Sequence, residues 1–121
     1  MRDFRKIKVW DRAHQLVLAV YEATSTFPRE EMFGLTSQIR RASASIPANI
    51  AEGCGRGSTA ELARFCRISL GSANELEYHF LLAKDLRMLE PASYDRLDAD
   101  LAEVKRMLVV YVDRLLENSK S

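Results

Sequence analysis

The sequence has 121 residues, of which 47% are hydrophobic and 29% charged, and its 18 Lys and Arg against 17 Asp and Glu leave a formal net charge of +1. This length suits one domain and leaves no room for a separate catalytic module. Five glycines and three prolines, with no low-complexity tract, exclude disordered, collagen-like and loop-rich proteins. We therefore expect a single domain over residues 1–121 with a hydrophobic core.

The sequence also shows no sign of secretion or membrane insertion. Its two cysteines, Cys54 and Cys66, are too few for the disulfide framework of a small secreted domain, which indicates free thiols in a reducing compartment. The apolar runs at residues 16–21 and 107–112 are far shorter than the roughly 20 residues that a membrane-spanning helix needs, and no signal peptide is visible. We expect a cytoplasmic protein with no membrane partner.

Apolar residues recur at helical spacing along almost the whole chain, which predicts four helices over residues of about 9–26, 30–53, 58–87 and 91–117. The first helix stops before Pro28, because the residue before a proline disfavours the helical conformation. The second is unusual, since no residue from Ala42 to Ala51 is charged. We expect this helix to be packed on several sides.

The last two helices have well-marked starts. Ser58 and Glu61 form a capping box for the third helix, and Pro91 suits the first turn of the fourth. Besides its main apolar stripe, the third helix carries a second, displaced strip that one bundle core cannot cover. The residues of this strip are Ile68, Leu82 and Leu86.

Four helices with short connections favour an all-α, up-down-up-down antiparallel four-helix bundle. The surplus apolar surface on the second and third helices indicates a homo-oligomer. We expect the strip of Ile68, Leu82 and Leu86 to contribute to the subunit interface. Ser45 and Asn49 are also candidates there, because polar groups on a crowded helix can set the register of an assembly.

Several segments of the sequence resemble the 23S (large-subunit) rRNA intervening-sequence proteins, also called four-helix-bundle proteins. The segments are residues 34–42 (GLTSQIRRA), 45–53 (SIPANIAEG), 55–56 (GR) and 71–77 (GSANELE). The match extends over about residues 4–116. The resemblance implies a left-handed four-helix bundle that assembles as a ring of five. Some relatives are accessory proteins of diversity-generating retroelements, in which a strongly basic pentamer associates with nucleic acid and a reverse transcriptase.

Charge is unevenly distributed along the chain. Residues 1–15 and 37–70 each carry five basic and two acidic side chains, whereas residues 71–104 carry three basic and eight acidic ones. Arginines suit bidentate phosphate contacts, and five of them cluster around one predicted loop and the helices beside it. These candidate nucleic-acid-binding residues are Arg40, Arg41, Arg56, Arg64 and Arg67. The competing interpretation is that Arg40 or Arg41 pairs with Glu52, Glu75 or Glu77, and that the other arginines are solvated.

The sequence predicts no catalytic residue, cofactor or metal. A two-metal site in a four-helix bundle takes a Glu from each of two helices and a Glu-x-x-His from each of the others, whereas this chain has only His14 and His79. The segment 53–58 is a candidate phosphate-binding nest, with a plain interhelical loop as the alternative. Beside Arg56, Cys54 is expected to be the more reactive thiol, and Cys66 a buried small hydrophobe.

Two functions stay open at this point. The first is a non-enzymatic, ring-forming bundle that contacts RNA or DNA and assists a nucleic-acid-processing protein, with binding lost in Arg56→Ala and Arg64→Ala. The second is a structural or protein-interaction scaffold with no nucleic-acid binding. The clustered arginines and the family resemblance favour the first, whereas the balanced net charge favours the second.

Overall fold

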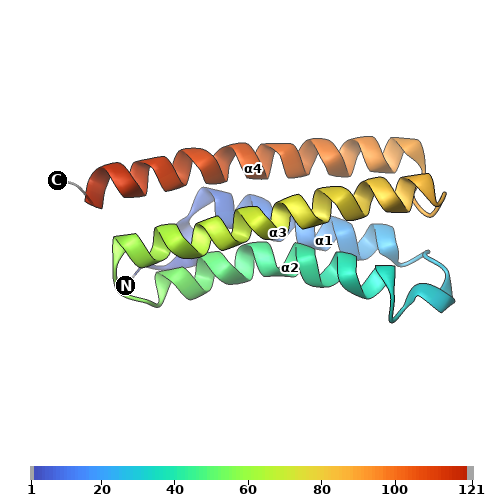
Figure 1. The fold of residues 1–121 in the computed structure, drawn as a ribbon, viewed down its shortest axis with the longest axis horizontal. Helices are drawn as coiled ribbons and strands as arrows, with labels where there is room; N and C mark the ends of the chain where they lie inside the picture. Colours follow the sequence, from blue (N-terminus) through green and yellow to red (C-terminus); the bar gives the residue numbers. More distant parts are fainter. Residues whose placement is uncertain (1, 120–121) are drawn as a thin grey trace.

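The computed structural model describes the backbone of residues 2–119 and the side chains of residues 2–118, so Met1 and residues 120–121 of the expected domain lie outside the described residues. Four α-helices and two short 3-10 turns make up the described chain (Figure 1). They are η1 (Phe4–Lys6), α1 (Lys8–Thr24), η2 (Arg29–Glu31), α2 (Leu35–Cys54), α3 (Thr59–Asp85) and α4 (Pro91–Ser119).

Each helix packs against two neighbours, α1 against α2 and α4, and α3 against α2 and α4. Among the described residues, no Cα atom of α1 lies within 8 Å of one in α3, and none of α2 lies within 8 Å of one in α4. Successive helices run in opposite directions, so the amino ends of α1 and α3 lie at the same end of the bundle as the carboxyl ends of α2 and α4 (Figure 1). The predicted all-α four-helix bundle is confirmed, whereas its handedness and its assembly into a ring stay predictions.

The start of α2 differs from its prediction. Residues 30–34 were expected to be helical, but the helix begins at Leu35, because Gly34 has φ −112° and ψ −116°, outside the helical region. The Glu31 carboxylate accepts a hydrogen bond from the backbone N–H of Leu35 at 3.2 Å and so caps the new start. A Cβ atom at Gly34 would lie 2.8 Å from that carboxylate oxygen, so a larger residue would have to displace the Glu31 side chain from its capping position.

Both ends of α3 are set by local hydrogen bonds. The Ser58 hydroxyl accepts from the backbone N–H of Glu61 at 3.1 Å, as the capping box predicts. At the other end the helix stops at Asp85, two residues before the predicted end, where Arg87 adopts a left-handed φ of 62°. The N–H of Met88 then donates to the carbonyl of Ala83 at 2.8 Å, which is the 6→1 bond of a Schellman motif.

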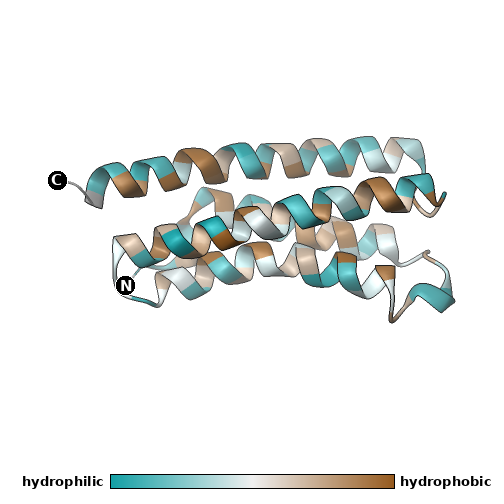
Figure 2. Ribbon diagram, in the orientation of Figure 1, coloured by the Kyte–Doolittle hydropathy of each residue, from teal (hydrophilic) through white to brown (hydrophobic). Residues whose placement is uncertain are grey.

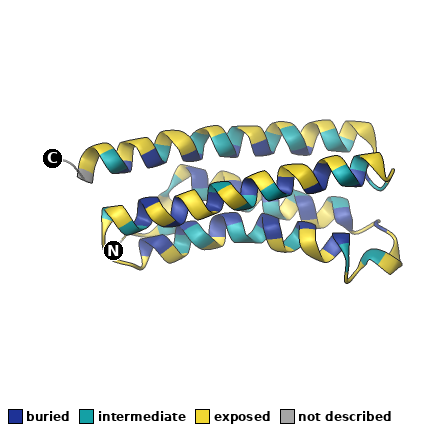
Figure 3. Ribbon diagram, in the orientation of Figure 1, coloured by how far each residue is buried: buried dark blue, intermediate teal, exposed yellow. Residues whose placement is uncertain are grey.

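One hydrophobic core runs the length of the bundle. Buried residues face inward on all four helices, and the hydropathic colouring follows the same stripes (Figures 2 and 3). Within this core the fully buried hydroxyl of Ser69 on α3 donates to the carbonyl of Ile46 on α2 at 2.8 Å. In the described part of the chain, no helix has the length and apolar character needed to cross a bilayer.

Candidate nucleic-acid interface

Arg40, the first of the five candidate arginines, bonds within the bundle. Its Nε donates to the Thr24 hydroxyl at 2.8 Å, and its Nη2 donates to the Tyr21 carbonyl at 3.3 Å. The guanidinium carbon also lies 4.7 Å from the centroid of the Tyr21 ring. Arg40 therefore ties α2 to α1, and a phosphate would have to compete with these contacts.

Arg41 forms the interhelical ion pair that the competing interpretation anticipated. Its Nη2 lies 2.9 Å from Oε2 of Glu75 on α3, and the same carboxylate oxygen lies 3.9 Å from Nε2 of His79. His79 is buried, and its Nδ1 has no hydrogen-bond partner among the described residues. The pair places both charges on the α2–α3 face.

Arg56 lies in the α2–α3 connection and Arg64 in the second turn of α3, and each has a glutamate partner. Arg56 Nη2 lies 3.2 Å from Glu52, and Arg64 Nε lies 2.8 Å from Glu61. Both guanidinium groups also lie over the Phe65 ring, at 5.0 and 4.6 Å from its centroid. The hydrogen bond from Arg64 lowers the pKa of the Glu61 carboxyl. In a full capping box this carboxylate would accept from the backbone N–H of Ser58, but here it accepts from Arg64 instead.

Arg67 differs from the other four candidates. Its side chain is exposed, and within the described residues it forms no hydrogen bond or ion pair. The five arginines therefore do not form one unpaired cluster. Exposed pairs such as those of Arg56 and Arg64 are weak and screened by salt, so a phosphate can displace their carboxylates.

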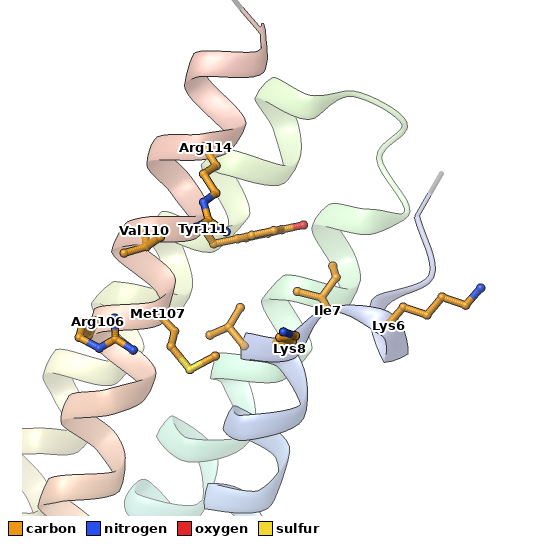
Figure 4. Close-up of a pocket in the computed structure, with 9 residues that line it drawn as sticks. Lys6, Ile7, Lys8, Arg106, Met107, Val110, Tyr111 and Arg114 are labelled. Carbon is orange, nitrogen blue, oxygen red and sulfur yellow. The ribbon is translucent and has the colours of Figure 1, made fainter.

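A second basic surface, which the sequence analysis did not select, lies at the same end of the bundle. It surrounds a cleft of about 400 Å³ between the start of α1 and the last turns of α4 (Figure 4). Its basic residues come from both ends of the chain: Lys6 and Lys8 precede or begin α1, and Arg106 and Arg114 lie on α4. We name these four residues and the space between them the α1–α4 cleft.

The charges in the α1–α4 cleft are only partly neutralised. Arg106 Nε donates to Glu103 at 2.9 Å, and this bond lowers the pKa of the Glu103 carboxyl. Lys6, Lys8 and Arg114 are exposed and form no ion pair in the part of the chain that the structure describes. The cleft therefore presents unpaired positive charge to the solvent.

Local contacts hold the η1 side of the cleft in place. The Asp3 carboxylate caps η1 by accepting from the backbone N–H of Arg5 at 3.0 Å. The Phe4 ring packs against Trp10 of α1 with 4.9 Å between centroids, and Trp10 in turn stacks on His14 at 5.1 Å. These contacts fix the chain direction from η1 into α1 and so position Lys6 and Lys8.

The signal for this cleft was present in the sequence but incomplete. Residues 1–15 carry an excess of three positive charges, which the sequence analysis noted without assigning a site. Arg114 gave no such signal, because it lies among acidic residues near the other end of the chain. The two segments meet only because α1 and α4 are antiparallel neighbours.

The predicted interface residues fall into two groups. Ile68 on α3 and Leu86, the C-cap residue that follows this helix, are 42% and 55% exposed, and because they are five full helical turns apart they lie on one face. Leu82 is less exposed than these two residues, because it is half-buried and packs against the core. Its place at a subunit interface stays a prediction, as it does for Ile68 and Leu86.

Ser45 and Asn49 are half-buried on α2 and bond within their own helix. The Ser45 hydroxyl donates to the Ala42 carbonyl at 2.9 Å, and the Asn49 amide donates to the Ser45 carbonyl at 2.8 Å. These bonds satisfy polar groups on a crowded face without a partner chain. A role for them in an assembly stays a prediction.

The cysteine prediction needs a correction. Cys54 is buried in the last turn of α2, and burial raises the pKa of its thiol despite the opposing charge of Arg2. Burial also raises the pKa of Cys66, to about 12. A lowered pKa for Cys54 beside Arg56 is therefore wrong, because desolvation of the thiolate outweighs the nearby positive charge, whereas its higher reactivity relative to Cys66 stays a prediction.

The segment proposed as a phosphate nest lines a small pocket of about 200 Å³ together with Arg2. Gly53 is buried against α3, and Arg2 donates to the Thr59 hydroxyl at 3.3 Å beside the connection. Residues 55–58 connect α2 and α3, and a phosphate-binding nest in segment 53–58 stays a prediction. Among the described residues, no three His, Cys, Asp or Glu side chains lie close enough together to hold a metal ion.

Comparisons with known proteins agree with the resemblance seen in the sequence. A solved structure from Bacteroides thetaiotaomicron, described as a protein of unknown function from the S23 ribosomal protein family, is similar with a TM-score of 0.80 and 25% identity, over 87% of this chain and 95% of that chain. No curated protein matches the sequence significantly. The family model described as 23S rRNA-intervening sequence protein matches residues 5–110. This chain therefore belongs to the 23S rRNA-intervening sequence protein family.

Proposed function

We propose that this protein is a non-enzymatic accessory protein that binds the phosphate backbone of RNA or DNA at the basic end of its bundle and assists a nucleic-acid-processing partner. One observation carries the proposal. Lys8 and Arg114, from opposite ends of the chain, line the same cleft and have no acidic partner among the described residues. Unpaired cations around a cleft attract polyanions, and binding releases the counterions of the phosphates.

The arrangement of charge along the bundle supports this choice of surface. The acidic residues of segment 71–104 belong to the second half of α3, the α3–α4 connection and the first half of α4, toward the opposite end. The net charge of +1 is therefore the sum of a basic end and an acidic end of the bundle. Exposed Arg67 and the weakly paired Arg56 and Arg64 add positive charge at the same end of the bundle, on α3 and in the α2–α3 connection.

A binding titration with RNA and duplex DNA at about 50 and about 200 mM salt tests this proposal. We expect the double variant Lys8→Ala/Arg114→Ala to weaken binding and to reduce the salt slope by roughly 0.9 per lost contact on duplex DNA. A matched control, Arg29→Ala/Arg96→Ala, removes two exposed arginines at the other end of the bundle and should leave both quantities unchanged.

Three results would separate the two basic surfaces. If Arg56→Ala/Arg64→Ala weakens binding more than the cleft variant does, the arginines chosen from the sequence form the main surface. If the cleft variant and its control weaken binding equally, the attraction comes from general charge and the cleft is not the site. Absence of binding at about 50 mM salt would contradict the proposed function and favour the protein-interaction scaffold.

We also propose that the protein self-associates through the face of α3 that bears Ile68 and Leu86, in the ring of five that the family resemblance implies. The exposed large hydrophobic residues of α3 support this proposal, because monomers rarely leave such a surface in water. On this face they are Ile68 and Leu86, which are 42% and 55% exposed, whereas exposed Tyr78 and Leu81 lie on other sides of the helix.

The mass of the particle in solution tests the self-association. We expect Ile68→Asp to keep its helical content, because residue 68 is exposed in the single chain. We also expect this variant to lose the assembly, because the interface would bury the unpaired charge of the aspartate. Leu18→Asp is the matched control, since Leu18 is 52% exposed on the outer side of α1. Sedimentation that shows one unchanged mass for Ile68→Asp and Leu86→Asp would rule out this interface.

A further inference from the structure

The α1–α4 cleft has a lining that phosphate binding alone does not require. Below its basic rim lie the apolar side chains of Ile7 and Met107, together with Val110, which is 37% exposed. The aromatic ring of Tyr111 completes this lining. A surface that binds only the outside of a duplex needs cations but no apolar lining, because the flat faces of paired bases are stacked inside the duplex and cannot be contacted. The apolar lining indicates a ligand that also has an apolar, planar part.

Tyr111 is held in an orientation that suits such a ligand. Figure 4 shows its side chain extending from α4 toward η1, with Ile7 and Met107 on one side and Arg114 on the other. Its hydroxyl accepts a hydrogen bond from Arg2 Nη1 at 3.3 Å, which fixes the far end of the ring. Burial raises the pKa of this hydroxyl, so the group stays neutral beside the ligand. A fixed aromatic ring beside cations is the arrangement that proteins use to stack unpaired bases.

The size and the charges of the cleft agree with the same ligand. Its volume of about 400 Å³ is within the range of clefts that take small ligands, so it accommodates one nucleotide unit and not the width of a duplex. Lys8 and Arg114 lie on the rim, where the phosphates of a strand would pass once its base enters the cleft. Arg106 forms a hydrogen bond to Glu103, so the negative charge of this glutamate is neutralised and repels an incoming phosphate less.

We infer that the α1–α4 cleft binds single-stranded nucleic acid, with an unpaired base against Tyr111 and the adjoining phosphates on Lys8 and Arg114. This inference rests on the proposed function and specifies its substrate class. It separates two roles within one site. The cations bind any phosphate backbone, whereas Tyr111 distinguishes an unpaired base from a paired or absent one.

The test compares four probes of equal length and equal label: a single-stranded oligonucleotide, the same strand with its bases removed, the matching duplex, and polyglutamate. We expect the complete strand to bind roughly 5- to 100-fold more tightly than the abasic strand, which carries the same phosphates, because stacking adds to the electrostatic attraction. Tyr111→Leu should remove this difference and leave the affinity for the duplex unchanged. Tyr111→Phe retains the ring and should retain the difference, which separates stacking from loss of the Arg2 hydrogen bond.

Each remaining outcome contradicts a defined part of the inference. Equal affinity for the complete and abasic strands, with tight and salt-sensitive binding of both, would overturn the base-binding role while the proposed function stands. Failure of every nucleic-acid probe to bind would overturn both. Polyglutamate that binds as tightly as the complete strand would identify the cleft as a site for acidic protein segments. Thermal unfolding of Tyr111→Leu, with a midpoint close to that of the wild type, checks that the variant is folded.

Discussion

Replacement of Phe80 by alanine is expected to lower the free energy of unfolding by about 3–5 kcal/mol, because it leaves a large cavity in the bundle core. Phe80 is only 1% exposed and is the largest of the fully buried side chains. The neighbouring core side chains are close-packed and cannot close a cavity of this size without moving the helices. Chemical denaturation followed by circular dichroism, at one protein concentration, measures the change.

Phe33→Ala is the matched control for that experiment. The same ring is removed, but Phe33 lies in the α1–α2 connection and is 94% exposed. We expect its free energy of unfolding to change by no more than about 0.5 kcal/mol, as is usual for surface substitutions. Similar losses in the two variants would show that burial in the core is not what makes Phe80 important.

The second large effect is expected at Gly53, where α2 and α3 approach closely. A Cβ atom at this position would lie 2.9 Å from both Leu62 Cδ1 and Phe65 Cβ, closer than carbon atoms can pack. Gly53→Ala should therefore push the two helices apart and lower the free energy of unfolding by about 1–3 kcal/mol. The same denaturation experiment detects this change as a lower midpoint.

Gly71→Ala provides an internal comparison of opposite sign. Gly71 also lies within a helix, but a Cβ atom there would meet no atom within 4 Å. Alanine is the better helix former, so we expect this variant to gain about 0.5–1 kcal/mol. If both alanine variants shift stability in the same direction, the close approach at Gly53 is not what limits the side chain there.

Helix boundaries that depend on local chemistry were predictable from the sequence. The start of α3 follows from the Ser58 cap, and the start of α4 from Pro91, since each acts within one turn. The start of α2 was predicted too early, because the apolar spacing continues through residues that Gly34 keeps outside the helix. The early end of α3 at Asp85 likewise depends on the Schellman motif at Arg87. A glycine at this position would have indicated the motif in the sequence, whereas an arginine does not.

The candidate interface was only partly predictable. The sequence shows which residues are arginines and which glutamates, and it offered Glu75 as a partner for Arg41, which the structure pairs at 2.9 Å. It did not show that Arg40 bonds to Thr24 and Tyr21 instead. Partner choice depends on the relative rotation and height of neighbouring helices, which a periodic sequence pattern leaves open.

The sequence by itself determined the number of helices, their apolar faces and the family to which the protein belongs, because these follow from local periodicity, capping and extended motifs. Only the tertiary structure decided which charges stand unpaired and where they meet. Lys8 and Arg114 lie near opposite ends of the chain, and no local pattern connects them. They line one cleft because antiparallel packing brings the start of α1 beside the end of α4.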